Sequence, residues 1–287
     1  MRRKSAGLHV NSQGVGILIT VLIVVVGYLV LHTISTRHQA SGSTGPGTST
    51  MNEIAKVDLK HPYDNTPAAG WLEGAAGIVP PPAVAVGRYP AAEVADVMNR
   101  VKQLIISARL DGRVLATHDP APVLAQLAAE QVARLQPNLA PGDEKDSWWI
   151  SSKIANPFQL LPVVPRVTGS MAPSVDDKGE LAINTNYLFA YAFDAADPSR
   201  LTGPLDIVAV DRLEVEYDWI DDPQYDAASQ GMWFGKIQSF TFSANCDLVR
   251  HGLLAPDYSD RATVAGPQPR TDAQYFDPTI PIPPSNC

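Results

Sequence analysis

The stretch Leu181-Ala-Ile-Asn-Thr-Asn-Tyr-Leu-Phe-Ala-Tyr-Ala-Phe193 decides the fold, because large apolar and aromatic side chains occupy nearly every second position. Successive residues of a β-strand point to opposite faces of a sheet, so the odd-numbered residues share one face. Thr185 is the one polar residue in that series, and the other series consists of alanine and asparagine apart from Leu188. The stretch therefore predicts a long strand with one face against a core.

Two further segments towards the C-terminus show the same alternation. Residues 205–219 predict a strand whose inward residues are Leu213, Val215, Tyr217 and Trp219 and whose solvated residues are Arg212, Glu214, Glu216 and Asp218. Residues 232–246 predict another strand, with Met232, Phe234, Phe240 and Phe242 on the inward face. Together with 181–193 they indicate an antiparallel meander.

The strand before 181 can be given a register from its turn. A three-residue Asp177-Lys178-Gly179 loop, with the glycine left-handed, sets Asp176 opposite Glu180 and pairs odd positions with odd. Val167, Met171 and Val175 then share the face of Leu181, and Pro173 marks an edge strand because it lacks an N–H donor.

Two helices are predicted to cover this meander. From Pro90, apolar residues recur at the three-and-four spacing of one helix face, at Val94, Val97, Met98, Val101, Leu104, Ile105 and Ala108. A second amphipathic helix is expected between Asp119-Pro120 and Pro137, and Ser147 to Ile150 offers a short strand. The fold class is α+β: two amphipathic helices packed on a curved antiparallel meander of four or more strands.

The uncharged run from Gly14 to Leu31 predicts a membrane anchor. As a helix it reaches ~27 Å, close to the ~30 Å hydrocarbon core, and Thr33 and Ile34 can extend it. A cleaved signal peptide would have a shorter apolar core and a small-x-small cleavage site. Basic residues near the span favour the cytoplasmic side, and Arg2, Arg3 and Lys4 outnumber Arg37.

The predicted organisation follows from this span. We expect a cytoplasmic N-terminus (1–13), a transmembrane helix (14–34), an extracytoplasmic linker (35–89), an α+β ectodomain (90–250) and a Pro-rich tail (251–287). The protein is then a single-pass cell-membrane protein with its C-terminal domain outside. Residues 40–50, ASGSTGPGTST, make the first part of the linker a flexible tether.

Charge and cysteine usage constrain the partners. The chain has a net charge of −8, and residues 1–37 hold four of its 22 basic residues and none of its 30 acidic ones. The remainder is therefore strongly acidic, which argues against nucleic-acid binding. Cys246, in a predicted strand, and Cys287, the last residue, are expected to form a disulfide outside the cytoplasm. Two unpaired thiols or a bond between molecules are the alternatives.

The order of these elements resembles a known superfamily. A helical start followed by long antiparallel strands from about Val167 looks like the cone-shaped fold of ketosteroid isomerases and the nuclear transport factor group, over residues 90–248. Bacterial proteins similar in layout, with one membrane span before such a cone, include assembly components of type IV secretion and conjugation systems and proteins that accompany actinobacterial lipid importers. The resemblance implies a scaffold role and rests on no residue motif.

The search for chemistry singles out Asp211. It falls on the apolar face of its strand, where an unpaired carboxylate would be costly, so it needs a partner. If the loop 194–204 is centred near Ser199, Tyr187 lies opposite Asp211 and can donate to it, and Lys236 is a second candidate partner. The sequence contains no nucleophile elbow, phosphate loop or zinc motif. It therefore predicts no catalytic residue, metal or cofactor, and offers Tyr187, Asp211 and Lys236 as candidate ligand-binding residues.

Three functions remain open at this level. The leading one is a membrane-anchored extracytoplasmic binding or accessory protein of a cell-envelope assembly, with envelope proteins or a second copy as partners. The alternative is a small-molecule-binding or isomerase-like cup with Asp211 and Tyr187 in its pocket, which requires a void of ~300 Å³ or more reaching Asp211. A third is a structural spacer at the cell surface.

Overall fold

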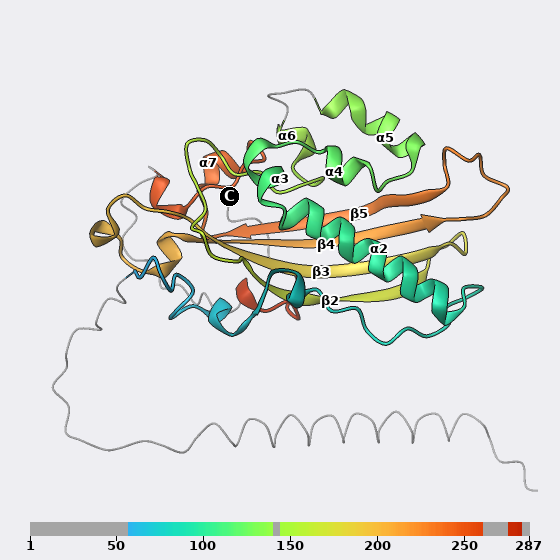
Figure 1. Ribbon diagram of the computed structural model, residues 1–287, viewed down its shortest axis with the longest axis horizontal. Coiled ribbons are helices and arrows are strands. Elements are labelled where there is room, and N and C mark those ends of the chain that lie inside the picture. The colour runs from blue at the N-terminus through green and yellow to red at the C-terminus, as the bar shows by residue number, and fades with distance from the viewer. Residues whose placement is uncertain (1–56, 140–143, 261–274, 283–287) are drawn as a thin grey trace, which may run out of the picture. The chain divides into compact units, whose positions relative to one another are not determined.

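One antiparallel sheet of five strands forms the centre of the described structure (Figure 1). The computed structural model describes residues 57–139, 144–260 and 275–282. The strands are β1 (Leu72–Glu73), β2 (Arg166–Val175), β3 (Leu181–Ala192), β4 (Val208–Ile220) and β5 (Gly231–Phe242), and they lie side by side in sequence order. The mixed helix and antiparallel-sheet class predicted from the sequence is confirmed.

The predicted register of the β2–β3 hairpin is also confirmed. Val175 lies opposite Leu181, and the Asp176 N–H donates to the Glu180 carbonyl at 2.9 Å. Gly179 has a φ of +85°, the left-handed conformation that glycine adopts without a steric penalty. β1 pairs only with Arg166 and Val167, so Pro173 lies where β2 has no strand on its outer side.

The helix α2 (Ala91–Arg109) crosses one face of the sheet and confirms the first predicted helix. All seven residues of its apolar stripe are buried, and they pack on the odd-numbered residues of β3 and β4. Asp111 then caps the short helix α3 (Gly112–Thr117) by accepting from the N–H groups of Arg113 and Val114.

The second predicted helix is broken. Its residues form α4 (Ala121–Leu124) and α5 (Ala129–Leu135), separated by Ala128 in a non-helical conformation. The Ala128 N–H donates to the Met232 carbonyl at 2.9 Å, and the Gln131 side chain bonds both the N–H and the carbonyl of Phe234. The helix is interrupted because residues at the break form hydrogen bonds with backbone groups of the edge strand β5. These tertiary contacts override the local helix propensity.

Shorter elements complete the described part. The proposed strand at Ser147–Ile150 is wrong, since α6 (Glu144–Ser147) and a turn occupy it. Cys246 begins the helix α7 (Cys246–Val249) rather than lying in a strand, because the Asn245 side chain caps a helical turn there. The 3₁₀-helices are Pro67–Gly70, Gly74–Gly77, Gln136–Asn138, Pro198–Arg200, Pro204–Asp206 and Asp257–Ser259.

A β-bulge in β5 reverses the side-chain alternation, so that even-numbered residues before and after it point to opposite faces of the sheet. Tyr217 pairs with Phe234 but Val215 pairs with Ile237, so β5 has one more residue than β4 between these pairs. An extra residue reverses the side-chain alternation beyond it. Met232 and Phe234 therefore face the helices as predicted, whereas Phe240 and Phe242 lie on the other face, where the prediction was wrong.

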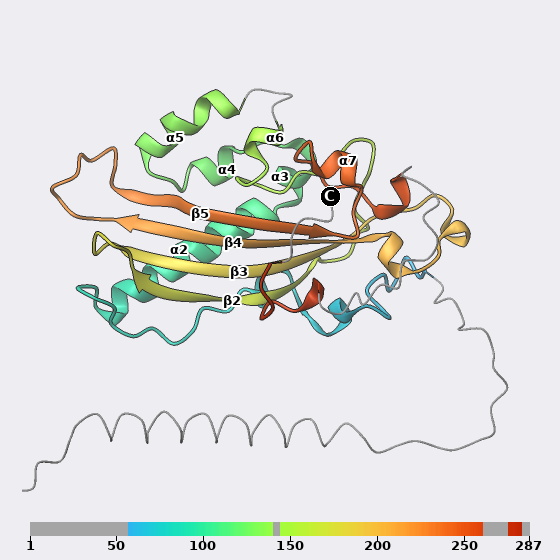
Figure 2. The same cartoon turned by 180° about the vertical axis from the view of Figure 1, so that it is seen from behind.

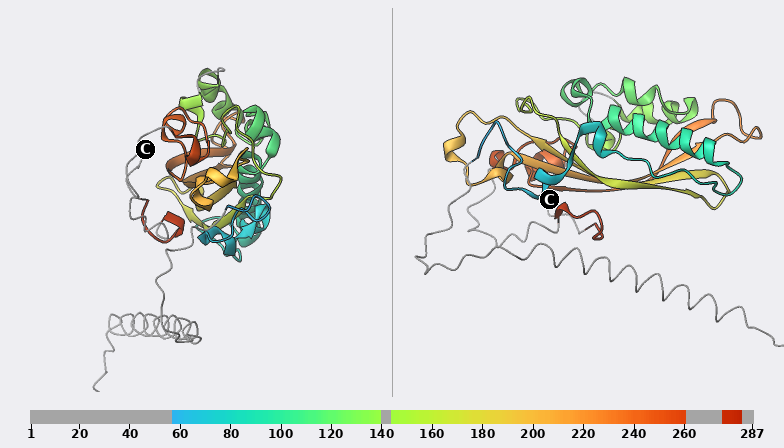
Figure 3. Two further views of the ribbon diagram at one scale, coloured as in Figure 1. Left: turned by 90° about the vertical axis from the view of Figure 1, so that its left-hand side faces the viewer. Right: turned by 60° about the horizontal axis from the view of Figure 1, so that its bottom comes forward.

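The face of the sheet opposite α2 carries a second core. Leu188, Ala190 and Val210 pack there with Phe240 and Phe242. They are covered by the segment from Val57 to Trp71 and by the C-terminal segment 275–282, which crosses this face in Figure 2. Seen end-on in Figure 3, the sheet lies between the helices on one side and that C-terminal segment on the other.

Residues 57–89 belong to the packed domain, although the sequence predicts them as part of the linker. Tyr63 and Ala68 are buried in this second core, and Ile78 and Tyr89 are buried in the core on the side of α2. A pattern of isolated apolar residues between glycines and prolines gave no periodic signal that could have placed them.

Arg212 is the clearest departure from the predicted solvated row. Its side chain is 3% exposed and donates to the Pro278 carbonyl at 3.0 Å, to the Ile280 carbonyl at 2.7 Å and to Asn186 Oδ1 at 3.1 Å. It also forms an ion pair with Glu214 at 2.8 Å. Arg212 therefore fastens the C-terminal segment to the sheet.

The predicted membrane anchor (14–34), the preceding residues 1–13 and Cys287 lie outside the described residues. Within the part that is described, no helix has the length and apolar character needed to cross a membrane. The disulfide between Cys246 and Cys287 stays a prediction.

Candidate functional site

Asp211 lies on the helix-facing side of β4, where the sequence placed it, and it is 7% exposed. Ser152 Oγ donates to one of its carboxylate oxygens and Thr241 Oγ1 to the other, each at 3.1 Å. Thr241 is opposite Asp211 on β5, while Ser152 comes from the loop after α6. The partners of Asp211 are therefore two hydroxyl groups, not the predicted tyrosine or lysine.

Arg109, at the end of α2, completes this network and is 3% exposed. Its guanidinium donates to Ser152 Oγ at 3.1 Å and to the Trp149 carbonyl at 2.5 Å, and its own carbonyl accepts from the Tyr191 hydroxyl at 2.9 Å. Burial raises the pKa of Asp211, while the positive charge of Arg109 and the two hydroxyl donors act in the opposite direction.

An open pocket of about 490 Å³ reaches Asp211. It lies between β4–β5, the residues around α6 and the chain that follows α7. Three hydroxyl side chains line the pocket: Ser152 and Thr241, which bond the carboxylate, and Ser239. The rest of the wall combines cationic and apolar side chains, from Lys145, Trp148, Lys153, Val249, Arg250, Leu253 and Leu254. The volume lies within the range of pockets that bind small molecules.

Tyr187 does not meet Asp211, so that predicted pairing is wrong. Tyr187 lies opposite Leu213, and Phe189 lies opposite Asp211. The connection between β3 and β4 is centred on residue 200 instead of Ser199, and a shift of the centre by one residue changes each cross-strand partner by two residues. Asp211 therefore stays on the predicted face of β4, but its neighbour on β3 is Phe189 instead of Tyr187. The Tyr187 hydroxyl has no hydrogen-bond partner among the described residues, and burial raises its pKa to about 12.

Lys236 was predicted to point inward and instead points to solvent. Its side chain is 88% exposed, and its ammonium group lies 3.6 Å from Glu216 Oε1 on the face opposite the helices. The β5 bulge causes this, because Lys236 lies in the part of the strand where the alternation reverses. Of the three predicted ligand residues, only Asp211 lines the 490 Å³ pocket. Lys236 lines a separate pocket of about 380 Å³, together with Glu214 and Glu216.

Sequence reasoning missed Arg109, Ser152 and Thr241. Arg109 lies four residues after Ile105 and so falls on the apolar stripe of its helix, a signal that could have flagged a buried guanidinium. Ser152 carries no such signal, because it reaches Asp211 from an irregular loop.

No group of three or more His, Cys, Asp and Glu side chains in residues 57–139, 144–260 and 275–282 is arranged to hold a metal ion. Comparisons of the chain with protein-family models, with curated proteins and with solved structures gave no match.

Proposed function

We propose that the protein is a membrane-anchored binding protein whose extracytoplasmic domain takes a small polar ligand in the Asp211 pocket. The observation that carries the proposal is the 490 Å³ volume at a buried carboxylate. Buried carboxylates are costly in a domain that only needs to be stable, so a pocket that keeps one at its wall is suited to recognise hydrogen-bond donors.

The chemistry of the wall narrows the ligand class. Asp211 and the hydroxyls of Ser239 and Thr241 suit a ligand with hydroxyl or amino groups. Lys145 and Lys153 outnumber Asp211 in the lining, while Arg250 is paired with Asp247 at 2.5 Å. The positive charge of the two lysines favours a ligand that also carries an anionic group. The class is therefore a small hydroxylated or amino-bearing anion.

Binding is favoured over an isomerase-like reaction by the position of Tyr187. In the resembled isomerases a tyrosine and an aspartate act on one substrate, but here Tyr187 does not line the pocket of Asp211. In addition, each oxygen of Asp211 already accepts a hydroxyl hydrogen bond. Both features suit a recognition group better than a general base.

The test is a thermal-shift screen of the full chain against small hydroxylated anions such as hydroxy acids and sugar phosphates. We expect a hit that stabilises the parent chain and has no effect on Ser239→Trp, which fills the pocket, or on Asp211→Asn. Lys236→Ala is the matched control, since Lys236 is outside this pocket. A hit that stabilises all four proteins equally, or no hit at all, counts against the pocket.

A second candidate is an accessory role in a cell-envelope assembly, through protein contacts. Of seven exposed large apolar side chains in the described part, five lie in residues 72–84 or at the two ends of β2: Leu72, Val79, Val84, Val164 and Val175. Apolar side chains gathered along one sheet edge favour a protein partner or a second copy. The type of assembly, secretion, conjugation or transport, rests on the resemblance in layout.

Photocrosslinking in intact membranes tests this role. A crosslinking residue at Val84 or Val164 is expected to give discrete adducts, while one at Tyr258, which is exposed elsewhere, is not. Labelling of cysteines introduced at position 5 and position 45 in whole cells tests the orientation, with only the second expected to react. A chain that gives no adduct from the β2 edge does not use this surface.

A further inference from the structure

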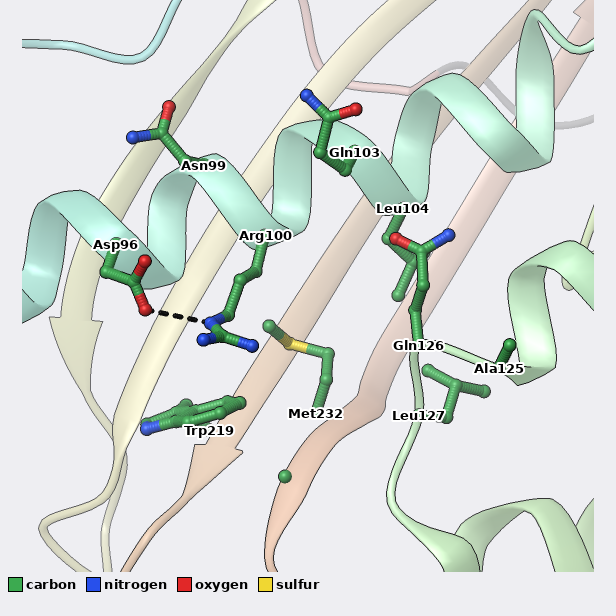
Figure 4. Close-up of a pocket in the computed structure, with 11 residues that line it drawn as sticks. Asp96, Asn99, Arg100, Gln103, Leu104, Ala125, Gln126, Leu127, Trp219 and Met232 are labelled. Carbon is green, nitrogen blue, oxygen red and sulfur yellow. Dashed lines mark hydrogen bonds and ion pairs between the residues drawn. The ribbon is translucent and has the colours of Figure 1, made fainter.

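A second pocket, of about 520 Å³, lies at the other end of the helix layer (Figure 4). It opens between α2, the residues that follow α4 and the adjoining ends of β4 and β5. None of its lining residues is shared with the Asp211 pocket. Its inner wall is apolar and consists of Leu104, Leu127, Met232 and the indole of Trp219.

The rim of this pocket is polar and partly fixed in place. Asp96 accepts from Arg100 Nε at 2.8 Å, and the Arg100 guanidinium lies over the Trp219 ring, 5.2 Å from its centre. From the opposite side, the Gln126 amide nitrogen donates to Ser107 Oγ and to the Pro122 carbonyl, both at 2.9 Å. The guanidinium, the indole and one carboxamide are thus held in position before any ligand arrives.

The rim carries no net charge. Asp96 and Arg100 neutralise each other, and the remaining polar groups are the carboxamides of Asn99, Gln103 and Gln126. A phosphate or carboxylate would gain little Coulomb energy here, since each would meet the carboxylate of Asp96 as well as the guanidinium. A wholly apolar ligand would remove water from five polar side chains without replacing their hydrogen bonds.

We propose that this pocket binds a neutral saccharide. Hydroxyl groups donate and accept at once, which matches the carboxamides of Asn99 and Gln103, which offer both functions, and a carboxylate beside a guanidinium. The Gln126 carboxamide, whose two N–H groups are already used, can accept through its oxygen. The C–H face of a pyranose ring matches the apolar wall and the half-buried indole. The open mouth admits one unit of a longer chain as readily as a free sugar. The proposal does not depend on the function proposed for the Asp211 pocket.

The test is a titration of the full chain with neutral trisaccharides, followed by the NMR signal of the Trp219 indole N–H. The chain is kept in a zwitterionic detergent, because alkyl-glycoside detergents carry a sugar head group. The probes are cellotriose, maltotriose and N,N′,N″-triacetylchitotriose, with the anionic trigalacturonate as comparison. We expect a saturable shift with at least one neutral probe and none with the anionic one.

Variants separate this site from adventitious binding. Because Trp219→Ala removes the NMR reporter, the affinities of the parent chain and of all variants are compared by isothermal titration calorimetry. Trp219→Ala is expected to weaken binding about tenfold, and Gln103→Ala, on the exposed face of α2, about threefold. Trp233→Ala is the matched control, because that indole also has an arginine, Arg134, over its ring at 5.2 Å but does not line the pocket. The proposal is overturned if no neutral probe gives a saturable shift, if only trigalacturonate binds, or if Trp233→Ala weakens binding as much as Trp219→Ala.

Discussion

Replacement of Arg212 by alanine tests whether the C-terminal segment is part of the folded domain. The variant removes an ion pair with Glu214 and the donors to Asn186, Pro278 and Ile280. Hydrogen bonds from a charged donor are each worth about 1.5–3 kcal/mol, so the four interactions set an upper bound of about 6–12 kcal/mol. Water can reach the released carbonyls at the surface, which brings the expected loss to the 3–5 kcal/mol typical of a broken buried pair.

Two measurements on the full chain check this value. Urea unfolding followed by circular dichroism gives the free energy of unfolding, and thermal unfolding should show a midpoint lowered by about 6–20 °C. Limited proteolysis should cut within 275–282 in the variant and spare it in the parent chain.

The matched control is Arg134→Ala, whose arginine is exposed and paired with Glu130 one helical turn away. Such a surface pair is expected to contribute less than about 1 kcal/mol. If Arg212→Ala loses no more stability than Arg134→Ala and its C-terminal segment is still protected, Arg212 does not fasten that segment to the sheet.

Three other predictions follow from single positions. Burial, reinforced by the negative charges of Glu216 and Asp176, raises the pKa of Asp218 from its ordinary 3.8 to about 6. The folded state therefore binds this proton more tightly than the unfolded state, and the resulting stability is lost as pH rises through about 6. Asp218→Asn should flatten the plot of unfolding free energy against pH between about pH 4 and pH 7, and an unchanged slope would contradict this. Gly169→Ala should cost about 2 kcal/mol or more because φ is +148° and the new Cβ would lie 2.2 Å from the Asn186 carbonyl oxygen, whereas Gly112→Ala, with no atom within 4 Å, should be neutral in the same urea titration. Unreduced full chain should show no maleimide-reactive cysteine, and Cys246→Ser should lower stability by roughly 4 kcal/mol if the loop to Cys287 is closed; two thiols reacting before reduction would rule the disulfide out.

The candidate site was predictable only in part, and Asp211 shows why. Its face follows from the alternation of β4, a property of the strand alone, so a carboxylate on the apolar side could be identified without coordinates. Its neighbours depend on the length and conformation of the loop 193–207. A shift of one residue in the centre of this loop puts Phe189 in place of Tyr187 opposite Asp211. Ser152 and Arg109 come from elements distant in sequence, and no local pattern brings them together.

The sequence by itself determined the elements whose burial is periodic. The stripe of α2, the alternation of β3 and β4 and the β2–β3 turn each carry their signal within a few residues, because helix and strand periods and the left-handed conformation of Gly179 are local properties. Tertiary structure alone decided the bulge that reverses β5, the break between α4 and α5 and the second core beneath Phe240 and Phe242. Each of these features pairs backbone groups or buries apolar surface of another part of the chain. No local sequence pattern contains that information, because the contacts form only when distant segments pack together.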